Sequence, residues 1–269
     1  MRLSTFALIV CAATISLDGL QSAHAQLTPE WSLCTGNPDV EWDRQITACT
    51  TLIQSGSEPR HGQSLAYNNR GIAWKAKGDL GRAIADYDQA IKVDPEVAQA
   101  YYNRGEAWYA KGDLDRAISD FSESIKLDPK HAYTYYNRGS AYFIKKEGDR
   151  AIADYNEAIY LDPSLAPAYN NRGIAWSVKS DPDRAIADYN TAIRLDPKNA
   201  SAYSNRGNAW KAKGDLDRAI ADYDQAIALD PLSVLALVNR GLAKRKKGDE
   251  SGAEADMAAA RRINPSTSK

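Results

Sequence analysis

Six asparagines recur at intervals of 34 residues, and their side chains could hold the main chain of another polypeptide. They are Asn69, Asn103, Asn137, Asn171, Asn205 and Asn239. A carboxamide both donates and accepts hydrogen bonds, so a column of them suits a peptide backbone of any sequence. Asparagine is a mediocre helix former, and six copies inside expected helices need a compensating use. The alternative use is hydrogen bonding between repeats, preserved by duplication, and one sequence leaves both open.

An arginine follows each of these asparagines, and an aspartate lies sixteen residues beyond each arginine. The pairs begin with Arg70 and Asp86 and end with Arg240 and Asp256. A half-buried guanidinium needs an anionic partner, and the spacing places the two groups at one level of an antiparallel hairpin. We therefore expect an ion pair within or between repeats at these positions, in preference to a ligand site.

Residues 1–25 have the features of a secretory signal peptide. Arg2 gives a positive start, Phe6–Ile15 is an apolar run shorter than the roughly 20 residues that span a bilayer, and Ala23–Ala25 has a small-x-small cleavage pattern. Cleavage is expected before Gln26. We expect an exported mature chain that does not insert into a membrane, most plausibly in a bacterial periplasm and otherwise secreted.

Two cysteines, Cys34 and Cys49, remain in the mature chain after this cleavage. An even pair in an oxidising compartment favours a structural disulfide. The spacing is not Cys-x-x-Cys, and no further ligand residue lies near, so a redox-active pair and a zinc site are weaker alternatives.

Composition and motifs disfavour catalysis and nucleic-acid binding. Lys and Arg total 34 against 35 for Asp and Glu, which lacks the basic footprint that binding to a phosphate backbone requires. The chain has 3 histidines, and we find no GxSxG, HExxH, glycine-rich phosphate loop or Cys–His constellation. We expect a non-enzymatic protein that uses no metal or cofactor.

A 34-residue repeat from Ser64 to Thr267 positions the asparagines and arginines. Each copy carries a glycine at the same place, an alanine twelve residues later and a proline twenty-four residues later. Apolar residues at i, i+4 and i+7 predict two amphipathic helices per copy. In the first copy Gly78-Asp79 makes the turn between them, and Asp94-Pro95 ends the second helix. The antiparallel pairing places Tyr67 opposite Ala90.

This pattern resembles the tetratricopeptide repeat. The family's aromatic, glycine, aromatic, alanine, aromatic, alanine and proline positions are matched by Tyr67, Gly71, Trp74, Ala83, Tyr87, Ala90 and Pro95. The resemblance implies an all-α, right-handed α-solenoid of six helix-turn-helix repeats, at 64–97, 98–131, 132–165, 166–199, 200–233 and 234–267. It also implies that the first helix of each repeat lines a concave groove. In some relatives, such as the repeat domain of the O-linked N-acetylglucosamine transferase, asparagines at this position hold a partner's main chain.

Two repeats depart from the pattern. The third has Lys146 at the turn and Gly148 shortly after it, which suggests an altered turn. The sixth has Leu237, Lys244 and Met257 at the aromatic positions, which is typical of a terminal repeat that caps an array.

Residues 26–63 are expected to form an N-terminal cap. Asp43–Ile53 is similar to the second helix of a repeat and predicts a half-repeat, followed by a polar linker over Ser55–Gln63. A Cys34–Cys49 bond would pin the irregular segment that contains Trp31 onto this helix.

The expected groove carries side chains that vary between repeats. Tyr102, Glu106, Tyr133, Tyr136 and Phe143 gather in the second and third repeats. Aromatic residues of this kind are typical anchors at interfaces, and ordinary packing between helices is the alternative. The basic residues that grip a carboxylate terminus in some chaperone-binding relatives are replaced, for example by Leu65 and Gln99, which disfavours that role.

These features favour a scaffold that binds a protein or an extended peptide in its concave groove. The alternative is a structural or assembly adaptor in an envelope complex that acts through its ends or its convex face. The exposed basic run Lys244–Lys247 would belong to such an end. The sequence names no partner.

Overall fold

The computed structural model describes residues 28–36 and 40–264, and this part of the chain is helical and contains no strand. The signal peptide expected over 1–25 lies outside the described residues. The chain divides into two compact units, Met1–Ala107 and Trp108–Lys269, which are described in turn. Within the described residues, no helix combines the length and the apolar character needed to cross a bilayer.

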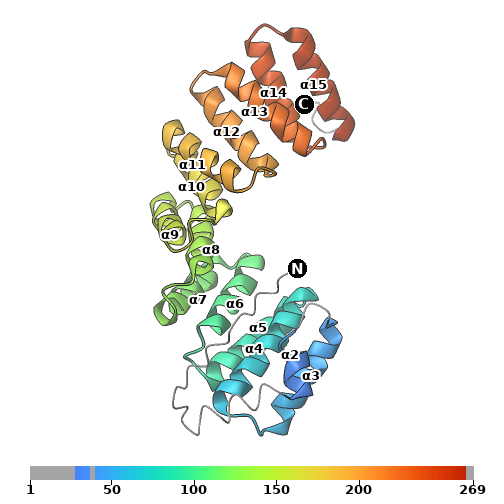
Figure 1. The fold of residues 1–269 in the computed structure, drawn as a ribbon, viewed down its shortest axis with the longest axis vertical. Coiled ribbons are helices and arrows are strands. Elements are labelled where there is room, and N and C mark those ends of the chain that lie inside the picture. The colour runs from blue at the N-terminus through green and yellow to red at the C-terminus, as the bar shows by residue number, and fades with distance from the viewer. Residues whose placement is uncertain (1–27, 37–39, 265–269) are drawn as a thin grey trace, which may run out of the picture. The chain divides into compact units, whose positions relative to one another are not determined.

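The expected hairpins are present in both units (Figure 1). The helices are α2 (Pro29–Cys34), α3 (Trp42–Ser55), α4 (Arg60–Ala76), α5 (Leu80–Val93), α6 (Ala98–Ala110), α7 (Leu114–Leu127), α8 (Ala132–Ile144), α9 (Gly148–Leu161), α10 (Ala166–Val178), α11 (Pro182–Leu195), α12 (Ala200–Ala212), α13 (Leu216–Leu229), α14 (Val234–Lys246) and α15 (Glu250–Ile263). We call α4, α6, α8, α10, α12 and α14 the A helices, and the helix that follows each of them its B helix. Apart from α4, every A helix begins at a predicted repeat boundary, so the all-α fold of repeated hairpins is confirmed. The handedness of the solenoid stays a prediction.

Close approach of the two helices explains the repeated glycine and aromatic residue. In the first hairpin, a Cβ atom on Gly71 would lie 2.6 Å from the ring of Tyr87, which is fully buried. Tyr67 packs against the cluster that contains Ala90, as the predicted pairing requires. A ring opposite a missing or small side chain fills the space between helices that approach closely.

An arginine stacks on an aromatic ring at the turn end of each of the first five hairpins, and in the first, second, fourth and fifth an aspartate also caps the B helix. In the third hairpin Glu147 bonds Arg150 but makes no capping hydrogen bond. The Asp79 carboxylate accepts the backbone N–H of Arg82 and also bonds its guanidinium, which lies 3.7 Å from the centre of the Trp74 ring. Arg82 thus takes part in the N-cap through its backbone N–H and in a cation–π contact through its guanidinium. The corresponding arginines are Arg116, Arg150, Arg184 and Arg218. The sequence analysis missed this contact, although an arginine eight residues after an aromatic is its signal.

The turn of the third repeat, where an alteration was expected, keeps the backbone conformation of the others but lacks their capping hydrogen bond. Lys146 has φ 64°, and in the fourth repeat Ser180 has φ 60°, where Gly78 has φ 82° and Gly214 has φ 85°. The left-handed conformation is therefore retained with a side chain in place. It costs an L-residue about 1–2 kcal/mol relative to its preferred conformations.

Glycine at these two turns should therefore stabilise the protein. We expect Lys146→Gly and Ser180→Gly each to raise the free energy of unfolding by about 1 kcal/mol, because relief of strain exceeds the entropy of the added glycine. Urea titration measures the change, with Gly214→Ser as the reciprocal control that should lose a similar amount. A loss of stability in the first two variants would show that these turns are unstrained.

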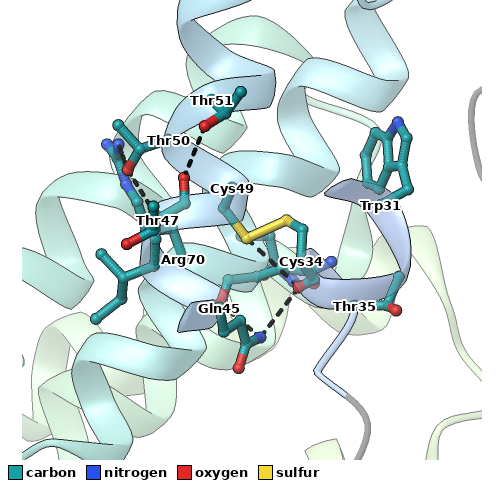
Figure 2. The surroundings of a disulfide bond; sticks show 12 residues. Trp31, Cys34, Thr35, Gln45, Thr47, Cys49, Thr50, Thr51 and Arg70 are labelled. Carbon is teal, nitrogen blue, oxygen red and sulfur yellow. Dashed lines mark hydrogen bonds between the residues drawn. A yellow bond between two sulfur atoms is a disulfide. The ribbon is translucent and has the colours of Figure 1, made fainter. Parts of the chain in front are cut away.

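The N-terminal unit begins with a disulfide-linked cap (Figure 2). Cys34 and Cys49 are bonded, with a Cα–Cα distance of 4.8 Å, and both are fully buried beside Trp31. The Gln45 side chain donates a hydrogen bond to the Cys34 carbonyl at 3.1 Å. The predicted disulfide is thus present in the structure.

Two local expectations for the cap are corrected. The segment around Trp31 forms the short helix α2, which Thr28 caps, where an irregular segment was expected. Helix α4 begins at Arg60, so the linker after Ser55 is shorter than the expected Ser55–Gln63. Arg60 explains part of this extension, because its guanidinium bonds the Val93 carbonyl at the end of α5.

Candidate functional site

The asparagine column lies on the A helices and bonds neighbouring repeats. In the first unit the Asn103 amide donates to Asn68 Oδ1 at 2.8 Å. In the second unit Asn171 donates to Tyr136 Oη at 3.2 Å, and Asn205 donates to Asn170 Oδ1 at 3.1 Å. In all three bonds, the acceptor belongs to the residue that precedes the column in the previous repeat.

The other members of the column have different surroundings. Asn69 Oδ1 accepts a bond from Asn68, and Asn239 Oδ1 accepts one from Lys211 Nζ at 2.9 Å. Asn137 is half-buried on α8. Bonds between repeats thus give Asn103, Asn171 and Asn205 a structural use. Contact of these six residues with a ligand stays a prediction.

Glu106 and Tyr102 meet on the A helices of the first unit. Lys75 Nζ donates to Glu106 Oε2 at 2.6 Å, and Tyr102 Oη donates to Glu106 Oε1 at 3.0 Å. The Glu106 carboxylate is thus held by two groups of the protein itself. A partner that used this carboxylate would have to exchange these bonds.

Tyr136 and Phe143 line a hollow on the A helices of the second unit, whereas Tyr133 lies outside its lining and is 49% exposed. The hollow has a volume of about 150 Å³. Its walls are the aromatic Tyr109, Tyr136, Phe143 and Tyr155, the aliphatic Ile144 and Ile174, and the polar Ser140 and Asn171. The structure thus brings Asn171 and Tyr136 of the predicted set together in one hollow.

The polar groups of the hollow bond one another. Tyr155 Oη donates to Ser140 Oγ at 3.3 Å, and Ser140 Oγ donates to the Tyr136 carbonyl at 3.0 Å. Asn171 Oδ1 accepts from Asn170 while its amide donates to Tyr136. Burial raises the pKa of the Tyr136 and Tyr155 phenols, so both are neutral at physiological pH. The hollow is therefore aromatic and uncharged.

Sequence reasoning missed five residues of the hollow, namely Tyr109, Ser140, Ile144, Tyr155 and Ile174. Tyr155 belongs to a B helix and appears in the sequence as a framework aromatic. Ile144 gave a usable signal, because the same repeat position holds Ala76, Ala110 and Ala212 in three other copies. A bulky apolar residue at a position that is alanine in half of the repeats indicates a local role.

The expected arginine–aspartate ion pairs form in the first, third, fourth, fifth and sixth repeats. Arg172 binds Asp188 through two hydrogen bonds, of 2.9 and 2.6 Å, and its third nitrogen donates to Asn156 of the preceding B helix at 2.7 Å. Equivalent two-bond pairs join Arg70, Arg138, Arg206 and Arg240 to Asp86, Asp154, Asp222 and Asp256. These arginines therefore hold each hairpin together and attach it to the one before.

The remaining histidines take part in local contacts. His61 bonds Asp94 at 2.8 Å, and His131 bonds Thr134 at 2.7 Å. Within residues 28–36 and 40–264, no group of three or more His, Cys, Asp and Glu side chains gathers as a metal site.

Successive hairpins, fastened by the same ion pair and differing in the side chains on their A helices, define a helical repeat protein. The chain belongs to the tetratricopeptide repeat family. Models described as tetratricopeptide repeat match residues 68–132, 132–165 and 200–231, and one described as TPR repeat matches 181–214. No curated protein sequence matches the chain significantly.

Three solved structures with similar folds align with this chain over most of their own length. The crystal structure of MamA is 30% identical over 60% of this chain and 94% of its own, with a TM-score of 0.57. YrrB, described as a TPR protein with an unusual peptide-binding site, is 24% identical over 71% of this chain and 97% of its own, with a TM-score of 0.61. PilF of Pseudomonas aeruginosa is 18% identical over 77% of this chain and 95% of its own, with a TM-score of 0.68. The last two show likeness of fold alone.

Proposed function

We propose that this protein is a non-enzymatic scaffold whose A helices bind a protein or an extended peptide. The observation that carries the proposal is the hollow of the second unit. Two of its aromatic walls, Tyr109 and Phe143, share a repeat position that holds lysine, serine or arginine in the other repeats, so the framework does not require an aromatic residue there. Aromatic residues in a desolvated recess are typical binding anchors.

Exposed apolar side chains near the hollow support this proposal. Ile144 is 53% exposed and Val178 is 71% exposed, at a position occupied elsewhere by alanine or by Lys246. Exposed apolar groups gathered beside a recess mark interaction surfaces in soluble proteins. YrrB, whose description names a peptide-binding site, supports the same type of ligand.

The adaptor remains a second candidate because the last repeat also exposes leucines. Leu235 lies at the start of α14, and Leu242 lies about two turns later on the same face. Both side chains are exposed, as is Leu232 just before the helix. An envelope assembly could use this end of the array together with Lys244–Lys247.

We also propose that the protein is exported to a bacterial periplasm. The buried Cys34–Cys49 bond supports this, since structural disulfides persist in oxidising compartments. The intact mass of the exported protein should correspond to a chain that begins at Gln26. A membrane-bound species that retains Arg2 would contradict this proposal.

Two exposed tyrosines of one repeat allow a matched test of the binding face. Tyr133 lies on helix α8, whereas Tyr160 lies on helix α9 and is 80% exposed. A partner is first captured from an envelope extract, identified by mass spectrometry and purified for titration. We expect Tyr133→Glu to weaken its binding roughly tenfold or more, because a carboxylate would replace an aromatic contact at the interface. Tyr160→Glu should leave affinity unchanged. The opposite result would favour the adaptor, and thermal melting of both variants checks that each is folded.

A further inference from the structure

We infer that the hollow between Tyr136 and Ile174 is the subsite for one benzene-sized aromatic side chain, a phenylalanine, of the bound polypeptide. This inference rests on the proposed function and adds the chemistry of the partner at one point. It follows from three properties of the hollow: the residue types that line it, the state of its polar groups, and its size.

Part of the lining is apolar at positions where some other repeats carry polar or charged side chains. The position of Phe143 and Tyr109 holds Lys75, Lys211 and Arg245 in other repeats. The position of Ile174 is polar in three repeats, as Glu106, Ser140 and Asn208, and apolar in two, as Ile72 and Leu242. Charged and amide side chains are thus compatible with the hairpin at both positions. The aromatic residues Tyr109 and Phe143 are therefore not required by the framework, whereas Tyr155 is the framework aromatic of its repeat.

The polar groups of the hollow do not call for a polar occupant. The Tyr155 hydroxyl is bonded to Ser140, and the Asn171 amide is bonded to Tyr136. An apolar side chain can enter without leaving these groups unpaired, which is the main cost of burying polar atoms. No charged side chain lines the hollow. A charged occupant would lose hydration and gain no ion pair.

Size and ring geometry favour an aromatic occupant. An apolar cavity of about 150 Å³ accommodates benzene, and the hollow has about this volume. The Tyr136 and Tyr155 rings are tilted by 44° with their centroids 6.1 Å apart. Rings in such tilted arrangements attract a further ring through edge-to-face contacts. A phenylalanine side chain satisfies both conditions.

The test uses small neutral probes that carry one side chain between two amide groups. N-acetyl-phenylalanine methylamide is titrated into the full chain, and the methyl signals of Ile144 and Ile174 are followed by NMR. We expect saturable shifts with a Kd on the order of 1 mM, as for a ligand of this size. The Ile72 methyl, in the other unit, should not move. The alanine analogue should produce no saturable shift, and the leucine analogue should bind more weakly than the phenylalanine one.

A matched pair of variants locates the site. Ile174→Glu and Ile72→Glu both place a carboxylate at the repeat position where Glu106 occurs naturally, so both should fold, which melting curves verify. Ile174→Glu should weaken the phenylalanine probe at least fivefold, and Ile72→Glu should have no effect. Equal effects of the two variants, unmoved signals with the phenylalanine probe, or equal affinity for the alanine or leucine analogue would overturn the inference.

The proposed binding face and the proposed phenylalanine subsite can fail separately. If Tyr133→Glu weakens the partner but the phenylalanine probe leaves the Ile144 and Ile174 signals unmoved, the subsite is wrong and the proposed binding face stands. If the probe binds but Tyr133→Glu does not affect the partner, the proposed binding face is wrong, and the inference fails with it.

Discussion

Replacement of Asp188 by alanine should lower the free energy of unfolding by about 3 kcal/mol. Asp188 is 6% exposed and accepts two hydrogen bonds from the Arg172 guanidinium. Its removal leaves a largely buried cation without an anion, and breaking a buried pair in this way typically costs about 3–5 kcal/mol. We expect the lower end of this range because Arg172 is partly exposed and keeps its bond to Asn156.

Asp183 provides the control on the same helix. It pairs with Lys213, and most of its side chain is exposed. Asp183→Ala should cost less than about 1 kcal/mol, as exposed ion pairs contribute little. Urea unfolding compares the two variants, and hydrogen exchange should rise first in α10–α13, since each repeat contacts only its neighbours. Equal losses of unfolding free energy in Asp188→Ala and Asp183→Ala would contradict the structural role assigned to the Arg–Asp pairs.

Loss of the Cys34–Cys49 disulfide should destabilise the N-terminal cap by up to about 3 kcal/mol, the chain-entropy value for a loop of this length. Helix α2 has only 6 residues and cannot persist alone. In a Cys34→Ser/Cys49→Ser variant we expect exchange of the α2 and α3 amides to rise strongly, because the cluster around Trp31 opens. The amides of α12 and α13 should keep their protection.

Thiol titration under denaturing, non-reducing conditions provides the check on this prediction. The exported wild-type chain should show no free thiol from Cys34 or Cys49. Two reactive thiols, or an unchanged exchange pattern in the double variant, would show that the disulfide does not stabilise the cap.

The framework could be predicted because it repeats. The positions within the repeat predict that Arg172 faces Asp188 and that Tyr67 faces Ala90. In the structure Arg172 pairs with Asp188, and Tyr67 packs against the cluster that contains Ala90. Six copies in register average out local exceptions. The Cys34–Cys49 pairing was predictable for a simpler reason, since only two cysteines follow the expected signal peptide.

The hollow could be predicted only in part, because its residues come from several repeats and the sequence does not show which of them lie together. Tyr109, Phe143 and Ile174 come from three different A helices, and Tyr155 comes from a B helix. None of them is unusual within its own helix. Lys146 shows the converse limit, because its sequence suggested a changed turn while the neighbouring helices impose the left-handed conformation on it.

Stability and binding are therefore expected to respond to different positions. Substitutions in the Arg–Asp pairs should destabilise a hairpin, whereas substitutions at exposed A-helix positions such as Tyr133 should alter the affinity for the partner in a folded protein. The asparagine column has a place in both sets, since Asn171 bonds the neighbouring repeat and also lines the hollow.

Site-specific photocrosslinking to the captured partner tests the central claim most directly. A photoreactive benzoylphenylalanine is placed either at Ile144 on helix α8 or at Tyr160 on helix α9, both exposed positions of one repeat. If the A helices form the binding face, the probe at position 144 crosslinks to the partner, the crosslinked peptide carries a phenylalanine near the site of attachment, and the probe at position 160 remains unreacted. Crosslinking from position 160 without crosslinking from position 144 would contradict the account.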